Sequence, residues 1–165
     1  VARQVDISPS LISYHFATKT TLMSDVVTHI IADMDTTITS EIGDTDSARV
    51  ALRALIESQV RYFAEHTDAV LALGHIGNSG DGAITAQLDR HRTASIAELE
   101  ELFTAGQQAG EMPTFPTRPM AVTLMAALEA VPTEFRVSLG TDTTAYGTAL
   151  ADLFDAATRH ADSQA

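Results

Sequence analysis

The chain of 165 residues is long enough for about one domain with its own hydrophobic core. Its composition, 45% hydrophobic and 19% charged, is ordinary for a globular protein. No apolar run reaches the roughly 18 residues of a membrane span, no signal-peptide pattern opens the sequence, and without cysteine there is no disulfide or thiolate chemistry. We therefore expect a cytoplasmic protein with no membrane partner.

The formal net charge of -12 argues, at first inspection, against a nucleic-acid binder. Residues 1–29 are neutral, because two basic and two acidic side chains balance there, so the whole deficit lies in residues 30–165. An acidic body repels DNA phosphates, and any DNA contact must therefore come from the N-terminal end. The sequence lacks an initiator methionine and begins with the pattern of a helix interior, so we expect the native protein to start further upstream.

Apolar residues recur at spacings of three and four, which predicts six or seven helices and no sheet. At the N-terminus we expect the end of one helix (1–5), a tight turn (6–8) and a short helix (9–16), in which Ser8 is the N-cap and Pro9 takes the first position. A long helix follows, which Thr18 caps and which runs to about Glu41. Its expected inner stripe consists of Leu22, Val26, Ile30, Met34 and Ile38.

Five further helices are predicted, separated by loops rich in Gly, Asp and Pro, over residues 47–66, 67–77, 83–109, 118–139 and 142–159. Three of them carry apolar stripes. These stripes are Leu52, Leu55, Ile56, Gln59, Val60 and Phe63; Ile84, Leu88, His91, Ser95, Leu99 and Leu102; and Tyr146, Leu150, Leu153, Phe154 and Ala157. Gly110 is a predicted helix stop. Helix 118–139 is apolar nearly all round, so we expect it to be buried on both sides, with a kink before Pro132.

The segment from Val1 to Leu22 resembles the second half of the helix-turn-helix of TetR-family transcriptional regulators. The similarity rests on the turn containing Ile7-Ser8, on Tyr14-His15-Phe16 at the end of the short helix, and on Lys19 three residues later. By motif it covers residues 1 to about 30, and the remainder is similar in helix number, order and length. The resemblance implies an all-α fold, with a partial helix-turn-helix DNA-binding domain and connecting helix over residues 1–40 and a helical-bundle effector-binding and dimerisation domain over residues 41–165.

A short helix in the major groove presents its N-terminal residues to base edges. In this chain those residues are Pro9, Ser10 and Leu11. A serine hydroxyl donates or accepts hydrogen bonds, and a leucine side chain contacts a thymine methyl group. By resemblance, phosphate contacts come from Ser13, Tyr14, His15 and Lys19. Two residues depart from the family pattern: Asp6 replaces the usual turn glycine, and Ser13 stands where tyrosine is frequent.

Two polar residues interrupt the apolar stripes. Gln59 requires a hydrogen-bond partner, which either a neighbouring helix or an effector supplies. His91 is interpreted first as a core histidine and second as a ligand contact. Our candidate effector-binding residues are Gln59, Tyr62, Phe63, His91, Met120 and Leu124. The spacings among His66, His75 and His91 fit no helix-face pair, so we predict no metal site; we also predict no cofactor and no catalytic activity.

The sequence thus predicts a homodimeric DNA-binding regulator, by resemblance a repressor, which a small-molecule effector controls. Its expected partners are double-stranded operator DNA, the effector and a second copy of the chain, with residues 118–159 forming most of the dimer interface. An effector between the helices of residues 47–139 would shift the spacing of the two DNA-reading ends. The alternatives are an all-helical ligand-binding or adaptor protein that does not read DNA and, third, an α-helical enzyme.

Overall fold

The computed structural model describes residues 18–138 and 140–159. Within them the secondary structure is helical, as the predicted all-α class requires. The helices are α2 (Lys19–Ile42), α3 (Ala48–Glu65), α4 (Thr67–Gly77), α5 (Gly82–Gln108), α6 (Thr117–Val137) and α7 (Thr143–Ala157). Their bounds lie within about two residues of those predicted. The predicted short reading helix and its residues Pro9, Ser10, Leu11, Ser13, Tyr14 and His15 lie outside the described residues.

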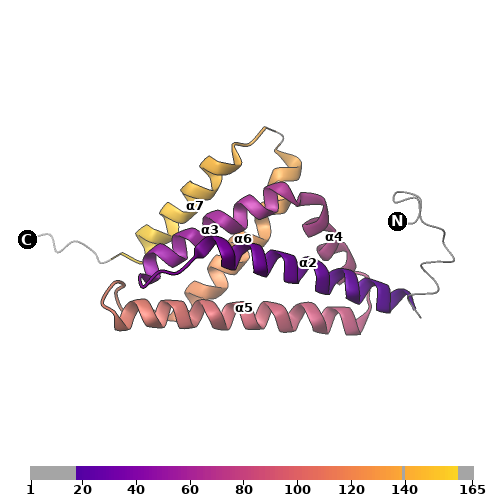
Figure 1. The fold of residues 1–165 in the computed structure, drawn as a ribbon, viewed down its shortest axis with the longest axis horizontal. Coiled ribbons are helices and arrows are strands. Elements are labelled where there is room, and N and C mark those ends of the chain that lie inside the picture. Colours follow the sequence, from indigo (N-terminus) through magenta and orange to yellow (C-terminus); the bar gives the residue numbers. More distant parts are fainter. Residues whose placement is uncertain (1–17, 139, 160–165) are drawn as a thin grey trace, which may run out of the picture.

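Helix α3 lies at the centre of the bundle and packs against all five other helices (Figure 1). Its buried side chains therefore cover more of its circumference than a single stripe would. α7 packs along α3 on one side, whereas α5 runs along the opposite edge and packs against α2, α3, α4 and α6. The core between these layers includes Ile56, Val60, Phe103, Leu124 and Leu128, each almost fully buried. None of the described helices is both long and apolar enough to span a membrane.

The expected inner stripe of α2 is wrong at Val26, whose side chain is exposed, whereas Val27 beside it is fully buried. A stripe written at every fourth residue advances about 40° per step around a helix of 3.6 residues per turn, so it drifts off the core face. Met34 and Ile38 remain buried as predicted. The apolar pattern therefore locates the helix correctly but not the face of its first half.

One further expectation fails, on the last helix. Leu153 and Ala157 of α7 were expected to point inward, yet both are exposed, because α7 packs on α3 through Gly147, Ala151 and Phe154. Helix α6 was expected to be buried on both sides, with one face against the core and the other against a partner, and burial by a partner stays a prediction. In the single chain it buries one face and exposes the other. The exposed face comprises Val122, Ala126, Ala130, Thr133 and Val137.

The N-terminus of α3 is tied to the end of α5. Gly110 stops α5 with a φ of 74°, which favours glycine, and the chain then turns back so that the backbone N–H of Met112 donates to the Gly106 carbonyl oxygen over 3.1 Å. This turn places Glu111 at the start of α3. Its carboxylate accepts a hydrogen bond from the Ser47 hydroxyl at 2.8 Å and one from the Arg49 backbone N–H at 3.1 Å. These two bonds, the hydroxyl first, hold the pKa of Glu111 below its usual range.

Replacing Glu111 with glutamine is expected to lower the melting temperature at pH 7, because the charged cap of α3 is lost. Because the pKa of Glu111 is lower in the folded protein than in the unfolded chain, its charged form stabilises the fold above the ordinary carboxyl pKa of about 4.5. This contribution is lost as pH falls through the lower pKa of the folded state. The difference in melting temperature between the two proteins should therefore stay constant from pH 7 to about pH 5 and narrow as pH falls further below about 4.5. Glu101→Gln, at an exposed position, is the control that changes charge alone. A difference that does not depend on pH would contradict this role.

Candidate ligand-binding site

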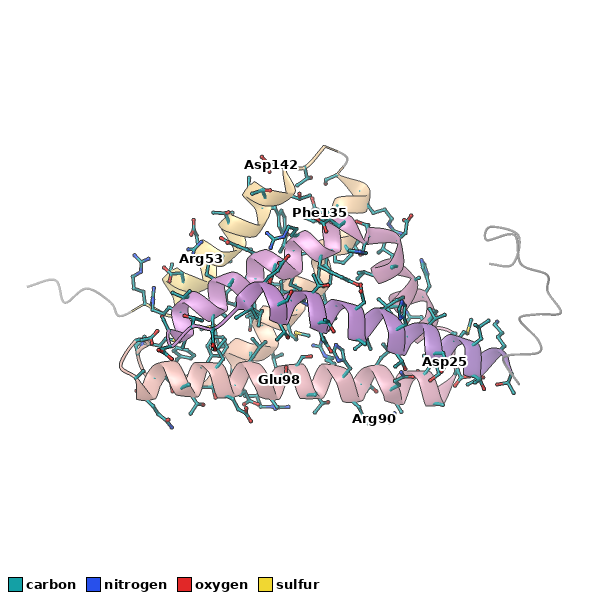
Figure 2. The ribbon with its side chains drawn as sticks, viewed as in Figure 1. Asp25, Arg53, Arg90, Glu98, Phe135 and Asp142 are labelled. Atoms are coloured by element: carbon teal, nitrogen blue, oxygen red, sulfur yellow. The ribbon has the colours of Figure 1, made fainter. Side chains whose placement is uncertain are left out.

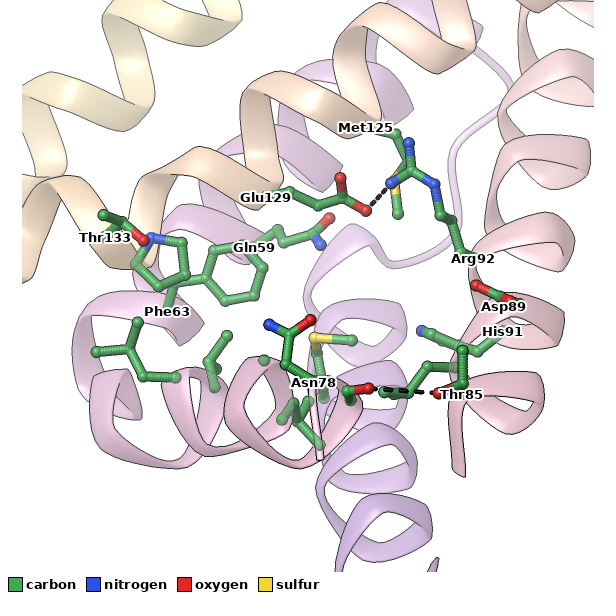
Figure 3. A pocket seen from close by; sticks show the side chains of 18 residues that line it. Gln59, Phe63, Asn78, Thr85, Asp89, His91, Arg92, Met125, Glu129 and Thr133 are labelled. Carbon is green, nitrogen blue, oxygen red and sulfur yellow. Dashed lines mark hydrogen bonds and ion pairs between the residues drawn. The ribbon is translucent and has the colours of Figure 1, made fainter. Parts of the chain in front are cut away.

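A cavity of about 480 Å³ lies between α3, α4, α5 and α6 and reaches Met34 of α2 (Figure 3). This volume lies within the range of small-molecule pockets. Most of its wall is apolar. The main apolar side chains are Phe63, Val70, Leu71, Leu88, Met125 and Pro132.

Three polar side chains project into this cavity from different elements: Gln59 from α3, Asn78 from the C-cap of α4, and His91 from α5 (Figure 3). In the part of the chain that the structure describes, none of the three side chains has a hydrogen-bond partner. At the edge of the cavity Arg92 forms an ion pair with Glu129 of α6. The cavity therefore combines an apolar wall with uncommitted donors and acceptors, the usual composition of a site for a small organic molecule.

A second cavity of about 300 Å³ lies between α2, α3, α5 and α6. It is lined mainly by aliphatic side chains, among them Ile38, Ile42, Leu55, Leu99 and Leu102. Four residues line both cavities: Met34, Gln59, His91 and Met125. The two cavities are therefore neighbours, and these four side chains form the wall between them.

The structure brings three of the six predicted effector-binding residues to the larger cavity: Gln59, Phe63 and His91. The other three, Tyr62, Met120 and Leu124, line neither of the two cavities. Leu124 is fully buried in the core, and Met120 is half-buried against it. Contact of any of these residues with an effector stays a prediction.

Tyr62 precedes Phe63 by one residue, or about 100° around α3, and therefore faces α2 instead of the cavity. Its hydroxyl donates a hydrogen bond to Asp33 over 2.8 Å, and its ring stacks on that of His66 with centroids 4.2 Å apart. Burial, followed by the Asp33 contact, raises the pKa of Tyr62. These interactions give Tyr62 a structural role between α2 and α3.

Sequence reasoning missed other lining residues. Met34 and Met125 belong to both cavities, but methionine on an apolar stripe is typical of an ordinary core. Asn78 falls in the loop between the predicted helices 67–77 and 83–109, and Arg92 is a charged residue within the second of them, so neither position indicates a binding site. No group of His, Cys, Asp or Glu among the described residues is arranged to hold a metal ion.

The N-terminal end of α2, which follows the predicted reading helix, is fixed to the start of α5. Thr18 is the N-cap, as predicted, and accepts a hydrogen bond from the Thr21 backbone N–H at 3.0 Å. The Thr20 hydroxyl donates to Asp81 over 2.6 Å, which lowers the pKa of that carboxyl group. One turn further along, Gln87 accepts a hydrogen bond from the Ser24 hydroxyl at 2.8 Å. Lys19 is exposed at the first position of α2.

No protein-family model and no curated protein sequence matches the chain. Solved structures, in contrast, match the chain over most of its length. A regulatory protein of the TetR family from Rhodococcus RHA1 is similar with a TM-score of 0.79 and 18% identity over 98% of this chain and 85% of the other. A TetR-family transcriptional regulator from Rhodococcus sp. has a TM-score of 0.73 and 22% identity over 95% and 84% of the two chains.

The TetR-family transcriptional regulator PfmR from Thermus thermophilus has a TM-score of 0.71 and 16% identity over 93% of this chain and 84% of its own. All three similarities extend over most of both chains, although the sequences have diverged widely. The chain therefore has the all-α fold of the TetR-family transcriptional regulators.

Proposed function

We propose that this chain is a TetR-type DNA-binding transcriptional regulator, most simply a cytoplasmic repressor, that a small-molecule effector controls. One observation carries the proposal: α2 directly follows the predicted reading helix of residues 9–16, and its Met34 lines both cavities. A ligand in this position contacts the helix that carries the DNA-reading end. The division into a DNA-binding part up to residue 40 and an effector part from residue 41 is consistent with the end of α2 at Ile42.

The hydrogen bonds between α2 and α5 supply a route from the cavity to the DNA-reading end. Asp81 and Gln87 bond to the first turns of α2, and between them on α5 lies Thr85, which lines the larger cavity. A ligand that displaces the start of α5 would therefore displace the N-terminal end of α2. The effector would favour one spacing of two DNA-reading ends over another, which is a shift between existing populations.

Reading two half-sites requires a dimer, with half-sites about 34–36 Å apart for one helical turn of DNA. We propose that a second copy covers the exposed faces of α6 and α7. These faces present Val122, Val137 and Leu153, exposed by 37%, 66% and 63%, next to several alanines. Exposed apolar side chains gathered on the last two helices support an interface there.

Binding to random double-stranded DNA, followed by selection of the retained sequences, tests the proposal. We expect one enriched palindromic sequence and an affinity that falls steeply as salt rises, because phosphate contacts release counterions. An adaptor protein that does not read DNA would bind no duplex even at low salt, and that result would refute the proposal.

Lys19→Ala is expected to weaken binding to all DNA sequences alike and to lower the salt slope by about 1, the loss of one phosphate contact. Lys19 is exposed at the first position of α2, where free backbone amides also favour an anion. Arg90→Ala is the matched control, because it removes one exposed positive charge on α5, outside the proposed dimer interface. A changed sequence preference with an unchanged salt slope would assign Lys19 to base reading instead.

A further inference from the structure

The wall between the two cavities consists of side chains that rotate easily. Met34, Gln59 and Met125 are long and unbranched, and the fourth member, His91, is half-buried. Methionine in particular adapts its shape to a neighbouring molecule. Among the described residues, no hydrogen bond holds the Gln59 amide or the His91 ring in place. A ligand can therefore displace this wall without breaking a hydrogen bond.

The two cavities follow one face of α5. The larger one is lined by Thr85 and Leu88, the smaller one by Ser95 and Leu102, and His91 belongs to both. The stretch from Thr85 to Leu102 rises about 25 Å, at about 1.5 Å per residue. The combined space is therefore long and narrow.

The charges along this space are unbalanced. Asp89 at the larger cavity and Glu98 at the smaller one are exposed carboxylates, and within the described ranges no side chain pairs with either. The one guanidinium that lines the space, that of Arg92, is paired with Glu129. No lysine and no further arginine of the described residues lines the two cavities, so an anionic ligand would meet carboxylates without a free ammonium or guanidinium partner.

We infer that the two cavities are lobes of one channel along α5, and that the channel binds an elongated, largely apolar molecule that carries a positive charge. The inference rests on the proposed effector role of the cavity and names the chemical class of the effector. The apolar part lies along the aliphatic walls of both lobes. The cationic group lies beside Asp89 or Glu98, and the free amide of Gln59 bonds to any polar group at the middle of the molecule.

The first test is calorimetric titration with three compounds of equal chain length below their micelle-forming concentrations: decyltrimethylammonium, decanol and decanoate. We expect the cation to bind most tightly and the anion most weakly, with at least a tenfold difference in dissociation constant between the two. Decanoate binding as tightly as the cation, or no binding by any of the three, overturns the inference.

A second test changes the charge of the wall. Glu129→Gln leaves Arg92 without its partner, and we expect decanoate to bind at least tenfold more tightly to this variant than to the unmodified protein. Glu101→Gln removes the same charge from an exposed position on α5 outside both cavities and should leave decanoate binding unchanged. Equal effects of the two substitutions would show that net charge, and not the wall of the channel, governs the preference.

The length of the channel is tested with a series of alkyltrimethylammonium ions on the unmodified protein. Each further methylene that enters an apolar wall strengthens binding about fourfold. If both lobes are used, this gain continues from hexyl to dodecyl, whereas a gain that stops at hexyl restricts the ligand to one lobe and overturns the channel.

Ser95→Phe fills the smaller lobe. It should weaken dodecyl binding at least tenfold and hexyl binding much less, because a hexyl chain still fits beside Asp89 in the larger lobe, with the melting temperature as the control for folding. Binding of operator DNA is measured separately without any of these compounds. Failure of the ligand tests with DNA binding intact therefore refutes the ligand class alone, whereas loss of DNA binding in the unmodified protein refutes the proposed function.

Discussion

A protein in which Leu153 is changed to aspartate is expected to be a monomer at micromolar concentrations at which the unmodified protein is a dimer. Leu153 is 63% exposed on α7, and its neighbours on the same face are Ala149 and Ala156. A lasting homodimer buries about 2,000 Å² or more, and an unpaired charge inside such an interface costs several kcal/mol. Light scattering at a series of protein concentrations measures the change. The variant should also lose high-affinity binding to a site with two half-sites.

The structure supplies matched controls for this experiment. Val122 and Val137 belong to the exposed face of α6, so their replacement by aspartate should also dissociate the dimer. Val26 is 38% exposed on α2, which packs against α3, α4 and α5, and Val26→Asp should leave the dimer intact. Met125 is buried and lines both cavities, so Met125→Asp would damage the fold and is no test of the interface. A dimer that survives Leu153→Asp, or an unmodified protein that is already monomeric, would contradict the proposed interface.

The helices themselves were predictable because their ends carry local signals. Asp142 and Ser47 cap the helices that follow them through hydrogen bonds to backbone N–H groups, and Gly110 ends α5 in a left-handed conformation. Such signals depend on a few neighbouring residues and on local conformation. The packing faces were less predictable. Val26 and Leu153 are apolar residues that the single chain leaves exposed, and apolar character alone does not say whether a side chain faces the core, a partner or water.

The candidate site was predictable only where it departs from an ordinary core. Gln59 and His91 drew attention as polar residues on apolar stripes, and both line the cavities. Met34 and Asn78 gave no such signal. Their place in the site depends on how α2 meets α5 and how α4 meets α6, which are contacts between segments distant in the sequence. Figure 2 shows Glu98 on α5, the helix that the apolar periodicity predicts over residues 83–109. The same periodicity does not predict the cavity that Glu98 lines.

Phe103→Ala is expected to lower the free energy of unfolding by about 3–5 kcal/mol. Phe103 is the largest fully buried side chain of the core, and its ring meets that of Phe115 edge to face with centroids 5.6 Å apart. Removing it leaves a cavity between α5 and the segment before α6, and the loss is a large part of a typical total of about 5–15 kcal/mol. Unfolding by urea measures the change, at one fixed protein concentration because dimerisation adds to the apparent stability.

Phe135→Ala is the matched control, because Phe135 also makes an edge-to-face contact, with Tyr146 at 5.3 Å, but is only half-buried. We expect it to cost clearly less than Phe103→Ala, since less apolar surface returns to water. Phe103 lines neither cavity, so the folded fraction of the Phe103→Ala protein should still bind the decyl cation more tightly than the decyl anion. Equal losses of stability in the two variants would mean that the C-terminal half of α5 is not anchored through Phe103, and that another contact holds the helix that forms one wall of both cavities.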